Sequence, residues 1–326
     1  MRRRTLMTLG AAGLVSALPG CADGDEGKVP EAPKGPIVLG FSQVGSESGW
    51  RLANTKSIQS AARNNRIDLK FSNAEGDQAK QIAAIQSYID ARVNVISFAP
   101  VVESGWDDVL RRARDAGIPV VLTDRMINTK DESLYVSSIG AEFLSEGNLA
   151  ALYLGLDFAA AAGPVNVVEL LGTPDSTPTK QRSDGFAATI AREGKLRVVD
   201  AETGNWTQAG GATAMRKLLR RQKKIDAVFA QNDEMGLGAV AVLKEQGLKP
   251  GTQPRIVTVD ATRAGLKALA DGDLNYVVEC SPEIGSQLMS VVVDLYLGGS
   301  VPKRIESQKN VFNRDTAKDA LPTRTY

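Results

Sequence analysis

Histidine is absent from all 326 residues of the chain. Because histidine is the usual general base beside a nucleophilic Ser or Cys, Ser-His-Asp and Cys-His mechanisms are excluded. The commonest side-chain ligand of zinc and iron is also missing, and we expect neither a metal nor a cofactor. Chemistry based on carboxylates alone remains possible. The composition therefore favours a protein that binds over one that catalyses.

Excess charge, long apolar runs and cysteines are also scarce, and each absence excludes a class of protein or of bond. Neither sign of charge is in excess, since 39 Lys and Arg oppose 38 Asp and Glu, which argues against a nucleic-acid-binding surface. Beyond the N-terminus no apolar run is long enough for a transmembrane helix. Only two cysteines occur, Cys21 and Cys280. Cys21 belongs to the N-terminal motif described below, so Cys280 has no disulfide partner and is expected to be a small buried apolar residue.

The N-terminus has the pattern of an export signal. Three arginines at positions 2 to 4 precede an uncharged stretch, residues 5–18, which is too short for a permanent transmembrane helix. The paired arginines followed by Thr5, Leu6 and Met7 also resemble a twin-arginine signal. A Sec signal starts with basic residues too, so the sequence predicts export and leaves the route open.

The sequence Leu18-Pro19-Gly20-Cys21 resembles the lipobox of bacterial lipoproteins, although Pro19 is uncommon there. It implies cleavage before Cys21 and a lipid on the Cys21 sulfur. The alternative is an ordinary signal peptide with an incidental cysteine. Residues 22–36 are rich in Pro, Gly, Asp and Glu and poor in apolar side chains, which is typical of a flexible tether. We expect a signal peptide at 1–20, a lipidated tether at 21–36, and a membrane-anchored location outside the cytoplasm.

Strand-like and helix-like segments alternate along the rest of the chain. Apolar runs such as 93–99 and 165–170 are typical of buried strands. They alternate with helical patterns such as 78–91, which places Ile82, Ile85 and Ile89 on one face. This alternation predicts an α/β fold with parallel sheets covered on both faces by helices. The length of the mature chain favours two such units in tandem.

Polar and aromatic residues gather directly after the predicted strands. In doubly wound sheets, ligands bind beyond the carboxyl ends of the strands, so these positions are the candidate site. The segments are 42–51, 73–77, 100–106, 124–125, 172–182, 204–206 and 231–233, with Asp260 and Glu279. The segment Gly45 to Gly49 lacks the glycine spacings of nucleotide-binding loops, and we set nucleotide binding aside.

The residue types at these strand ends suit a sugar. Carboxylates accept hydrogen bonds from hydroxyl groups, arginine donates in a planar fork, and asparagine does both. Aromatic rings cover the apolar C–H faces of a sugar, and Trp50 and Trp206 supply one such ring in each half. Taken singly, each position has a structural alternative: Asp260 can cap a helix, and Trp106 is more typical of a core. Their joint placement favours a binding site.

The segment from Gly40 to Arg51, GFSQVGSESGWR, resembles the opening of galactofuranose-binding members of the type I periplasmic binding protein family. Further elements match the family in order: Ala99-Pro100-Val101-Val102 with Gly105-Trp106, Asp124-Arg125, Arg182-x-x-Gly185-Phe186, Gln231-Asn232-Asp233-Glu234-Met235, and Val278-Glu279. The later elements are general to ribose- and galactose-binding members, whereas the first is specific to the sub-family. The matches run from residue 37 to about residue 312.

The resemblance implies two Rossmann-like lobes, joined by three crossovers, that close on one monosaccharide. It implies an N-lobe of 37–140 and 281–303, and a C-lobe of 141–280 and 304–326. The implied ligand-binding residues are Glu47, Trp50, Arg51, Asp124 and Arg125 from the N-lobe, and Arg182, Trp206, Asn232, Asp260 and Glu279 from the C-lobe and hinge. A carboxylate at Glu279 fits the galactofuranose pattern, since ribose-type members commonly have an amide there. Trp206 stands where the family usually has Phe, which leaves the exact sugar open.

These features predict a monomeric, non-enzymatic substrate-binding lipoprotein of a sugar ABC transporter. It would bind a galactofuranose- or galactose-like hexose by hinge closure and deliver it to a membrane permease. A lipoprotein that presents sugar to a signalling receptor is an alternative that the sequence leaves open. A transcription regulator of this fold would need an N-terminal helix-turn-helix where this chain has an export signal. A carbohydrate enzyme that uses Asp124 and Asp260 is disfavoured because Arg125 adjoins Asp124 and no acid of raised pKa is indicated.

The lipobox interpretation predicts that Cys21→Ser protein is no longer held by membranes, because the sulfur that would carry the lipid is gone. Fractionation of cells that produce the wild type or the variant measures this. Retention of Cys21→Ser protein in the membrane fraction would contradict the lipid anchor.

Overall fold

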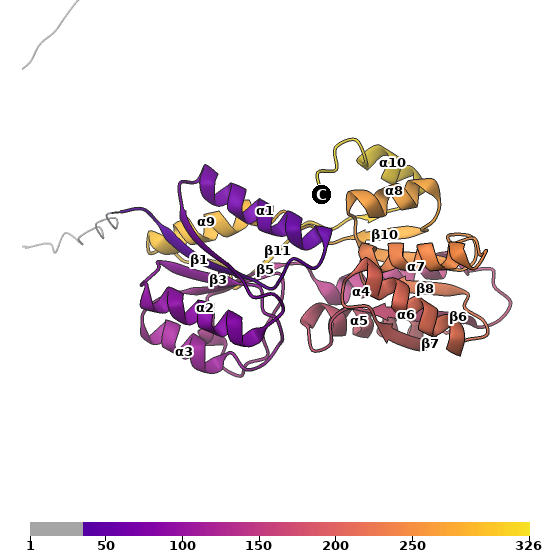
Figure 1. Ribbon diagram of the computed structural model, residues 1–326, viewed down its shortest axis with the longest axis horizontal. Coiled ribbons are helices and arrows are strands. Elements are labelled where there is room, and N and C mark those ends of the chain that lie inside the picture. The colour runs from indigo at the N-terminus through magenta and orange to yellow at the C-terminus, as the bar shows by residue number, and fades with distance from the viewer. Residues whose placement is uncertain (1–34) are drawn as a thin grey trace, which may run out of the picture. The chain divides into compact units, whose positions relative to one another are not determined.

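A computed structural model describes residues 35–326, and Figure 1 shows their helices and strands. One six-stranded sheet forms the centre of the N-lobe. The elements of this lobe are β1 (Val38–Gln43), α1 (Gly49–Asn64), β2 (Asp68–Asn73), α2 (Gln78–Asp90), β3 (Val95–Phe98), α3 (Asp107–Asp115), β4 (Val120–Thr123), the 3-10 turn η1 (Glu132–Leu134), β5 (Ser137–Gly140), α9 (Gly285–Tyr296) and β11 (Arg304–Glu306). The strand order is β11-β5-β4-β3-β1-β2, with all neighbours parallel.

A second six-stranded sheet forms the centre of the C-lobe. Its elements are α4 (Phe143–Asp157), β6 (Val165–Leu171), α5 (Thr177–Glu193), β7 (Leu196–Thr203), α6 (Gln208–Arg221), β8 (Ala227–Ala230), α7 (Asp233–Glu245), β9 (Arg255–Asp260), α8 (Arg263–Asp271), β10 (Tyr276–Glu279), β12 (Val311–Phe312) and α10 (Arg314–Ala320). The order is β12-β10-β9-β8-β6-β7, and only β12 runs antiparallel to its neighbour. The two sheets confirm the predicted α/β fold.

The chain crosses between the two sheets three times, after β5, after β10 and after β11. The last crossing corrects a predicted boundary. Arg304–Glu306 pairs with Ser138–Gly140 of β5 and completes the first sheet, whereas the sequence suggested that the C-lobe resumes at residue 304. A strand of three residues is too short to show a periodic pattern, which is why its lobe could not be read from the sequence.

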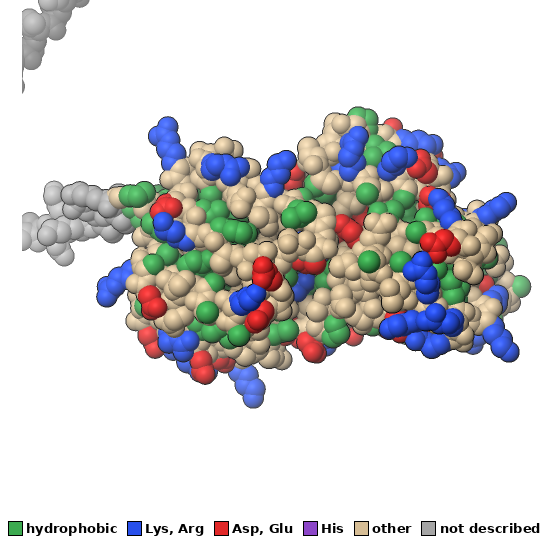
Figure 2. Space-filling model, in the orientation of Figure 1, with side chains coloured by type: hydrophobic (Ala, Val, Ile, Leu, Met, Phe, Trp, Pro, Cys, Tyr) green, Lys and Arg blue, Asp and Glu red, His purple; other side chains and the backbone are tan. Residues whose placement is uncertain are grey.

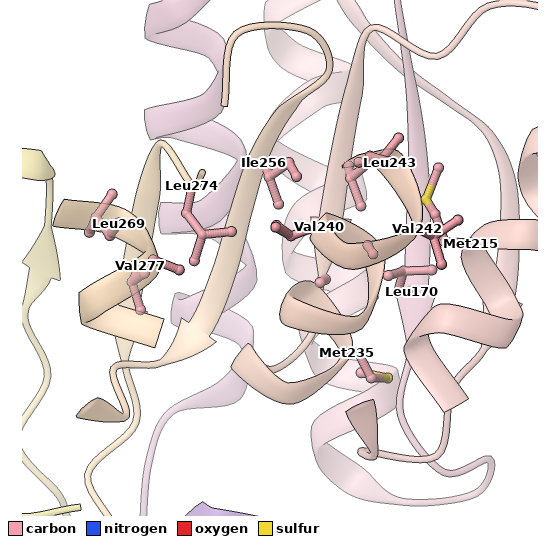
Figure 3. Close-up of a cluster of buried hydrophobic side chains, with 14 of the residues drawn as sticks. Leu170, Met215, Met235, Val240, Val242, Leu243, Ile256, Leu269, Leu274 and Val277 are labelled. Carbon is pink, nitrogen blue, oxygen red and sulfur yellow. The ribbon is translucent and has the colours of Figure 1, made fainter. Parts of the chain in front are cut away.

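Helices cover both faces of each sheet, so the central strands are buried on both sides. Every residue of β3, β4 and β8 is buried, as expected for parallel strands between two helical layers. In the N-lobe, α1 and α9 lie on one face and α2 and α3 on the other (Figure 1). In the C-lobe, α6, α7 and α8 cover one face, and Figure 3 shows the apolar side chains that pack there, including Met215, Leu243 and Ile256.

The described residues do not reach the predicted export signal. The signal peptide, Cys21 and the tether up to residue 34 lie outside them. No helix among residues 35–326 is both long enough and apolar enough to cross a membrane.

Helices α4 and α5 pack unusually closely because two glycines face the opposite backbone. A Cβ atom on Gly147 would stand 2.0 Å from the carbonyl oxygen of Arg182, and one on Gly185 would stand 2.1 Å from that of Leu144. No side chain fits at either point. The absence of these side chains therefore fixes the separation of the two helices, and with it the position of Arg182.

Gly185→Ala is expected to lower the free energy of unfolding by about 1–3 kcal/mol, because the added methyl group forces the backbones of α4 and α5 apart. Thermal and urea unfolding measure the effect. Gly163→Ala is the matched control, since a Cβ atom there would meet nothing within 4 Å. Equal stability of the two variants would show that the close approach does not constrain the fold.

Candidate functional site

A cavity of about 330 Å³ lies between the two lobes, at the carboxyl ends of their strands. The lining residues are Glu47, Ser48, Trp50, Arg51, Asp124, Arg125, Phe143, Pro178, Arg182, Trp206, Asn232, Asp260 and Cys280. Both acidic and basic side chains are visible where the surface is hollowed between the lobes (Figure 2).

The structure brings together every ligand-binding residue that the sequence suggested except Glu279. Four lining residues were missed. Ser48 lies within the predicted strand-end segment 42–51, and Cys280 directly follows Glu279 at the end of β10, but neither was among the predicted binding residues. Phe143, in the first turn of α4, lies outside the predicted strand-end segments, whereas Pro178, in the first turn of α5, lies within the segment 172–182 but was not among the predicted binding residues.

Glu279, predicted to bind the ligand, lies at the end of β10 but is not among the residues that line the cavity, and its carboxylate is bound by the C-terminal segment instead. Its carboxylate accepts hydrogen bonds from Arg324 at 2.5 Å, from the hydroxyl of Tyr326 at 3.0 Å, and from the side chain of Asn310. All three partners follow the last crossover between the lobes. Glu279 therefore holds the C-terminal segment against the hinge, and no local pattern links it to partners so far along the chain.

Arg51 is held at the N-lobe side of the cavity by two carboxylates. Its guanidinium lies 2.6 Å from Asp124 and 3.2 Å from Glu47, and it also donates to the side chain of Gln43. Burial by itself lowers the pKa of Arg51, but the two carboxylates outweigh it and raise the pKa above its ordinary value. The first turn of α1 presents this group because Ser48 caps the helix and accepts from the Arg51 amide.

Arg182 has an equivalent role on the C-lobe side. Its Nε lies 2.8 Å from the fully buried Glu146, and its Nη1 donates to the carbonyl oxygen of Gln231 at 2.7 Å. Burial lowers the pKa of Arg182, and Glu146 is the largest influence that raises it, with a net rise. Glu146 lies within α4 and away from any strand end, so the sequence did not single it out.

Asp260 is the least compensated charge in the cavity. It is buried, no group among residues 35–326 donates a hydrogen bond to its carboxylate, and its nearest cation is Arg182 at 4.0 Å. Burial raises the pKa of Asp260 well above its usual range, and Arg182 offsets this only in part. Its backbone has a φ of 124°, a strained value for a residue other than glycine. Such an acid contradicts the expectation from sequence that the site contains none of raised pKa.

Arg125 and Trp206 have donors that the rest of the described chain leaves unused. The Nε of Arg125, the Nε1 of Trp206 and the Oε2 of Glu47 are buried, and none has a hydrogen-bond partner within residues 35–326. An unsatisfied buried polar atom costs about 1–3 kcal/mol, and folded proteins satisfy nearly all of them. Burial and the nearby Arg51 lower the pKa of Arg125 to about 10, so it stays charged at neutral pH. These atoms are therefore available to a polar ligand.

Aromatic rings complete the wall of the cavity. The Trp206 ring lies under the guanidinium groups of Arg125 and Arg182, at 5.9 and 5.6 Å from its centroid. A Cβ atom on Gly172 would stand 1.9 Å from this ring, so the glycine makes room for it. Trp50 donates its indole N–H to the carbonyl oxygen of Cys280 at 2.5 Å, which joins the first turn of α1 to the hinge.

The lobes also touch each other directly beside the cavity. The backbone N–H of Met126 donates to the hydroxyl of Thr177 at 3.1 Å, and that hydroxyl donates to the Met126 carbonyl oxygen at 2.9 Å. Nearby, the N–H of Glu103 donates to the carbonyl oxygen of Asp175 at 3.1 Å. In each pair one residue belongs to the N-lobe and the other to the C-lobe. The structure is thus a closed arrangement of the two lobes.

Residues 39–300 match the family model of the periplasmic binding protein domain. The chain belongs to this family. Its members are binding proteins, which confirms the expectation that this chain binds and does not catalyse. Among curated proteins, the galactofuranose-binding protein YtfQ of Escherichia coli is 36% identical over 290 residues, 88% of this chain and 91% of the relative. The predicted resemblance to galactofuranose-binding members is thereby confirmed.

Two solved structures agree with this relationship. A protein of Mycobacterium smegmatis in complex with β-D-fucofuranose is 48% identical and superposes with a TM-score of 0.87, covering 88% of this chain and 94% of that one. The periplasmic binding protein component of the arabinose ABC transporter of Shewanella sp. ANA-3, bound to α- and β-L-arabinofuranose, is 40% identical with a TM-score of 0.84, covering 88% and 95%. Both proteins share the fold of the present chain.

Removal of the Glu146 carboxylate is expected to destabilise the protein strongly, because Arg182 then remains buried without its partner. For Glu146→Ala we expect a loss of about 3–5 kcal/mol in the free energy of unfolding, measured by urea denaturation. Glu193→Ala, at an exposed position near the end of α5, is the control and should change stability little. A Glu146→Ala protein as stable as this control would refute the structural role of the pair.

Proposed function

We propose that the protein is the substrate-binding component of a sugar ABC transporter. In this proposal it binds one monosaccharide, a furanose of the galactofuranose type, in the cavity between the lobes and delivers it to a membrane permease. The binding residues are those that the sequence suggested, without Glu279. The observation that carries the proposal is the set of unused polar atoms on Arg125, Trp206 and Glu47 in a cavity whose other charges are largely paired.

The charge balance of the cavity supports a neutral ligand that carries several hydroxyl groups. Arg51 and Arg182 are already neutralised by carboxylates of their own lobe. An anionic ligand would compete with those carboxylates, and a cationic one would face the arginines. Hydroxyl groups can instead accept from Arg125 and Trp206 and donate to Asp260 and Glu47 without disturbing either ion pair. The Trp206 ring offers an apolar surface for the C–H face of the same molecule.

The relatives support a five-membered sugar ring. The names of the curated relative and of the two solved structures refer to galactofuranose, fucofuranose and arabinofuranose. A furanose presents fewer ring atoms and a more extended exocyclic chain than the pyranose of the same sugar, which suits a small cavity with polar atoms on several walls. Trp206, which we expect to replace a Phe of the family, would narrow the choice among such sugars.

Closure of the lobes provides the mechanism. A sugar that bonds to Arg125 of the N-lobe and Asp260 of the C-lobe makes both contacts only when the lobes are together, so it favours the closed state. The closed shape is then the signal that a permease would recognise. The same reasoning serves a sensor that presents the sugar to a signalling receptor, which remains the second candidate because the N-terminal pattern suits either role.

Asp260 has the raised pKa of a general acid, but the arrangement around it does not suit catalysis. The second carboxylate of such a pair, Asp124, is bound to Arg51 at 2.6 Å and is not free to act as a base or nucleophile. The N-terminal motif adds that the protein is exported and anchored through Cys21. Export and the lipid anchor are therefore proposed from the sequence of residues 1–34 alone.

A thermal-shift screen with pentoses and hexoses tests the proposed function. A sugar that binds only the folded state adds about 2.7 kcal/mol to the free energy of unfolding when its concentration is one hundred times its Kd, and this raises the melting temperature. We expect sugars that adopt the furanose form in solution, galactose among them, to give the largest shifts. The absence of a shift with every sugar would overturn the proposal.

Variants of the cavity then test the site. For Arg125→Ala and Asp260→Ala, calorimetric titration with the best sugar should give an affinity lower by about ten- to hundredfold, because each change removes a charged hydrogen-bonding partner. Arg111→Ala, which removes an exposed arginine paired with Asp107 and Asp108, is the control. Unchanged affinity in either cavity variant would show that the sugar binds elsewhere.

A further inference from the structure

Glu234 and Gly49 are joined across the two lobes by a hydrogen bond that takes no part in the cavity wall. The backbone N–H of Gly49 donates to the Glu234 Oε1 at 2.6 Å, although 185 positions separate the two residues. Gly49 is the first residue of α1 in the N-lobe, and Glu234 lies in the first turn of α7 in the C-lobe. Neither of them lines the cavity.

The chemistry of the α1 N-terminus explains why a carboxylate is stabilising there. The first N–H groups of a helix have no partner within the helix, and its dipole favours a negative charge nearby. Ser48 caps α1 by accepting from the Arg51 amide, which leaves the Gly49 N–H to be satisfied from outside the helix. No acidic side chain lies in the first turn of α1 itself. The C-lobe therefore supplies the charge that the N-lobe helix lacks.

The bond connects two segments that carry ligand-facing residues. Trp50 and Arg51 directly follow Gly49, and Asn232 lies two residues before Glu234, and all three line the cavity. The bond thus fixes the distance between the first turn of α1 and the start of α7 while the side chains beside it face the ligand. Separation of the lobes breaks it, since its two atoms belong to different lobes.

Glu234 is half-buried in the closed state, and one of its two carboxylate oxygens is shielded from solvent. Burial raises the pKa of Glu234, and the bond from Gly49 opposes that rise. Its second oxygen, Oε2, is buried and has no hydrogen-bond partner within residues 35–326. The N-terminus of α1 is therefore the main group that compensates the desolvation of the Glu234 carboxylate. Without that contact, the carboxylate would be more stable in the open protein, where water can reach it.

We propose that Glu234 is a positioning residue that latches the lobes in the closed state and so sets how long the ligand is retained. This inference depends on the proposed function in one respect, namely that the ligand is a sugar. When only the closed state holds the ligand tightly, the apparent affinity falls with the closed fraction. Loss of the latch should therefore accelerate dissociation of the sugar and leave its association rate nearly unchanged.

Two variants break the latch from opposite sides. Glu234→Ala removes the acceptor. Gly49→Ala keeps it but adds a Cβ atom 3.0 Å from Oε1, which displaces the carboxylate, while alanine favours the helical conformation at this position. For each we expect an affinity about tenfold weaker for the best sugar of the thermal-shift screen, which corresponds to about 1.4 kcal/mol. The change should appear in the dissociation rate, measured by stopped-flow tryptophan fluorescence.

The double variant gives the sharpest test. If both changes remove one interaction, Gly49→Ala with Glu234→Ala weakens binding no more than either change alone. Glu234→Gln keeps an acceptor and should fall between the wild type and Glu234→Ala. Glu245→Ala, at the exposed opposite end of α7, is the control and should bind as the wild type does. Additive losses in the double variant, or wild-type dissociation from Glu234→Ala, would overturn the latch.

Failure of the latch and failure of the proposed function can be told apart. If the wild type binds sugar but the latch variants behave like Glu245→Ala, only the latch is wrong. If the wild type binds none of the sugars, the proposed function is wrong, and small-angle X-ray scattering without sugar decides the latch. A larger radius of gyration for Glu234→Ala than for the wild type supports it, and equal radii overturn it.

Discussion

The site depends on the neutralisation of two buried arginines by carboxylates of their own lobe. Arg51 is held by Asp124 and Glu47, and Arg182 is held by Glu146. Without these pairs, each lobe would bring an uncompensated cation to the cleft, and closure would bring like charges together. With them, each half of the cavity is close to neutral before any ligand arrives. The buried atoms of the cavity without a hydrogen-bond partner belong to Arg125, Trp206 and Glu47, and in the proposed function they select the ligand together with Asp260.

Two features of the fold bring the side chains of the site together. Parallel strands end at one edge of each sheet, so loops that are distant in sequence meet there, and the two edges face each other across the cleft. The close approach of α4 and α5, made possible by Gly147 and Gly185, then brings Glu146 and Arg182 within bonding distance. The hinge is fixed separately, by Glu279 with the C-terminal segment and by Trp50 with Cys280. Binding, closure and hinge geometry therefore rest on different contacts.

Much of this arrangement could be predicted from the sequence because it follows from local patterns. Buried apolar runs indicated the strands, and the rule of strand ends placed Asp124, Arg125 and Asp260 in one site. Glu146 could not be found in this way, because it pairs with Arg182 through helix packing that leaves no local pattern. Glu279 follows a strand end as the others do but does not line the cavity, because its carboxylate is bound by residues 31 to 47 positions further along the chain. A strand as short as β11 is likewise determined by its hydrogen bonds to β5, since three residues show no periodic pattern in the sequence.

The central claim is that one sugar closes the two lobes around the cavity formed by Arg125, Trp206 and Asp260. A crystal structure of the protein grown with galactose, which offers both ring forms in solution, tests it most directly. The account predicts one five-membered ring in the cavity, with hydroxyl groups bonded to the Nε of Arg125 and to the carboxylate of Asp260, and with a C–H face against the Trp206 ring. A sugar bound outside this cavity, or lobes that stay apart when the sugar is bound, would contradict it.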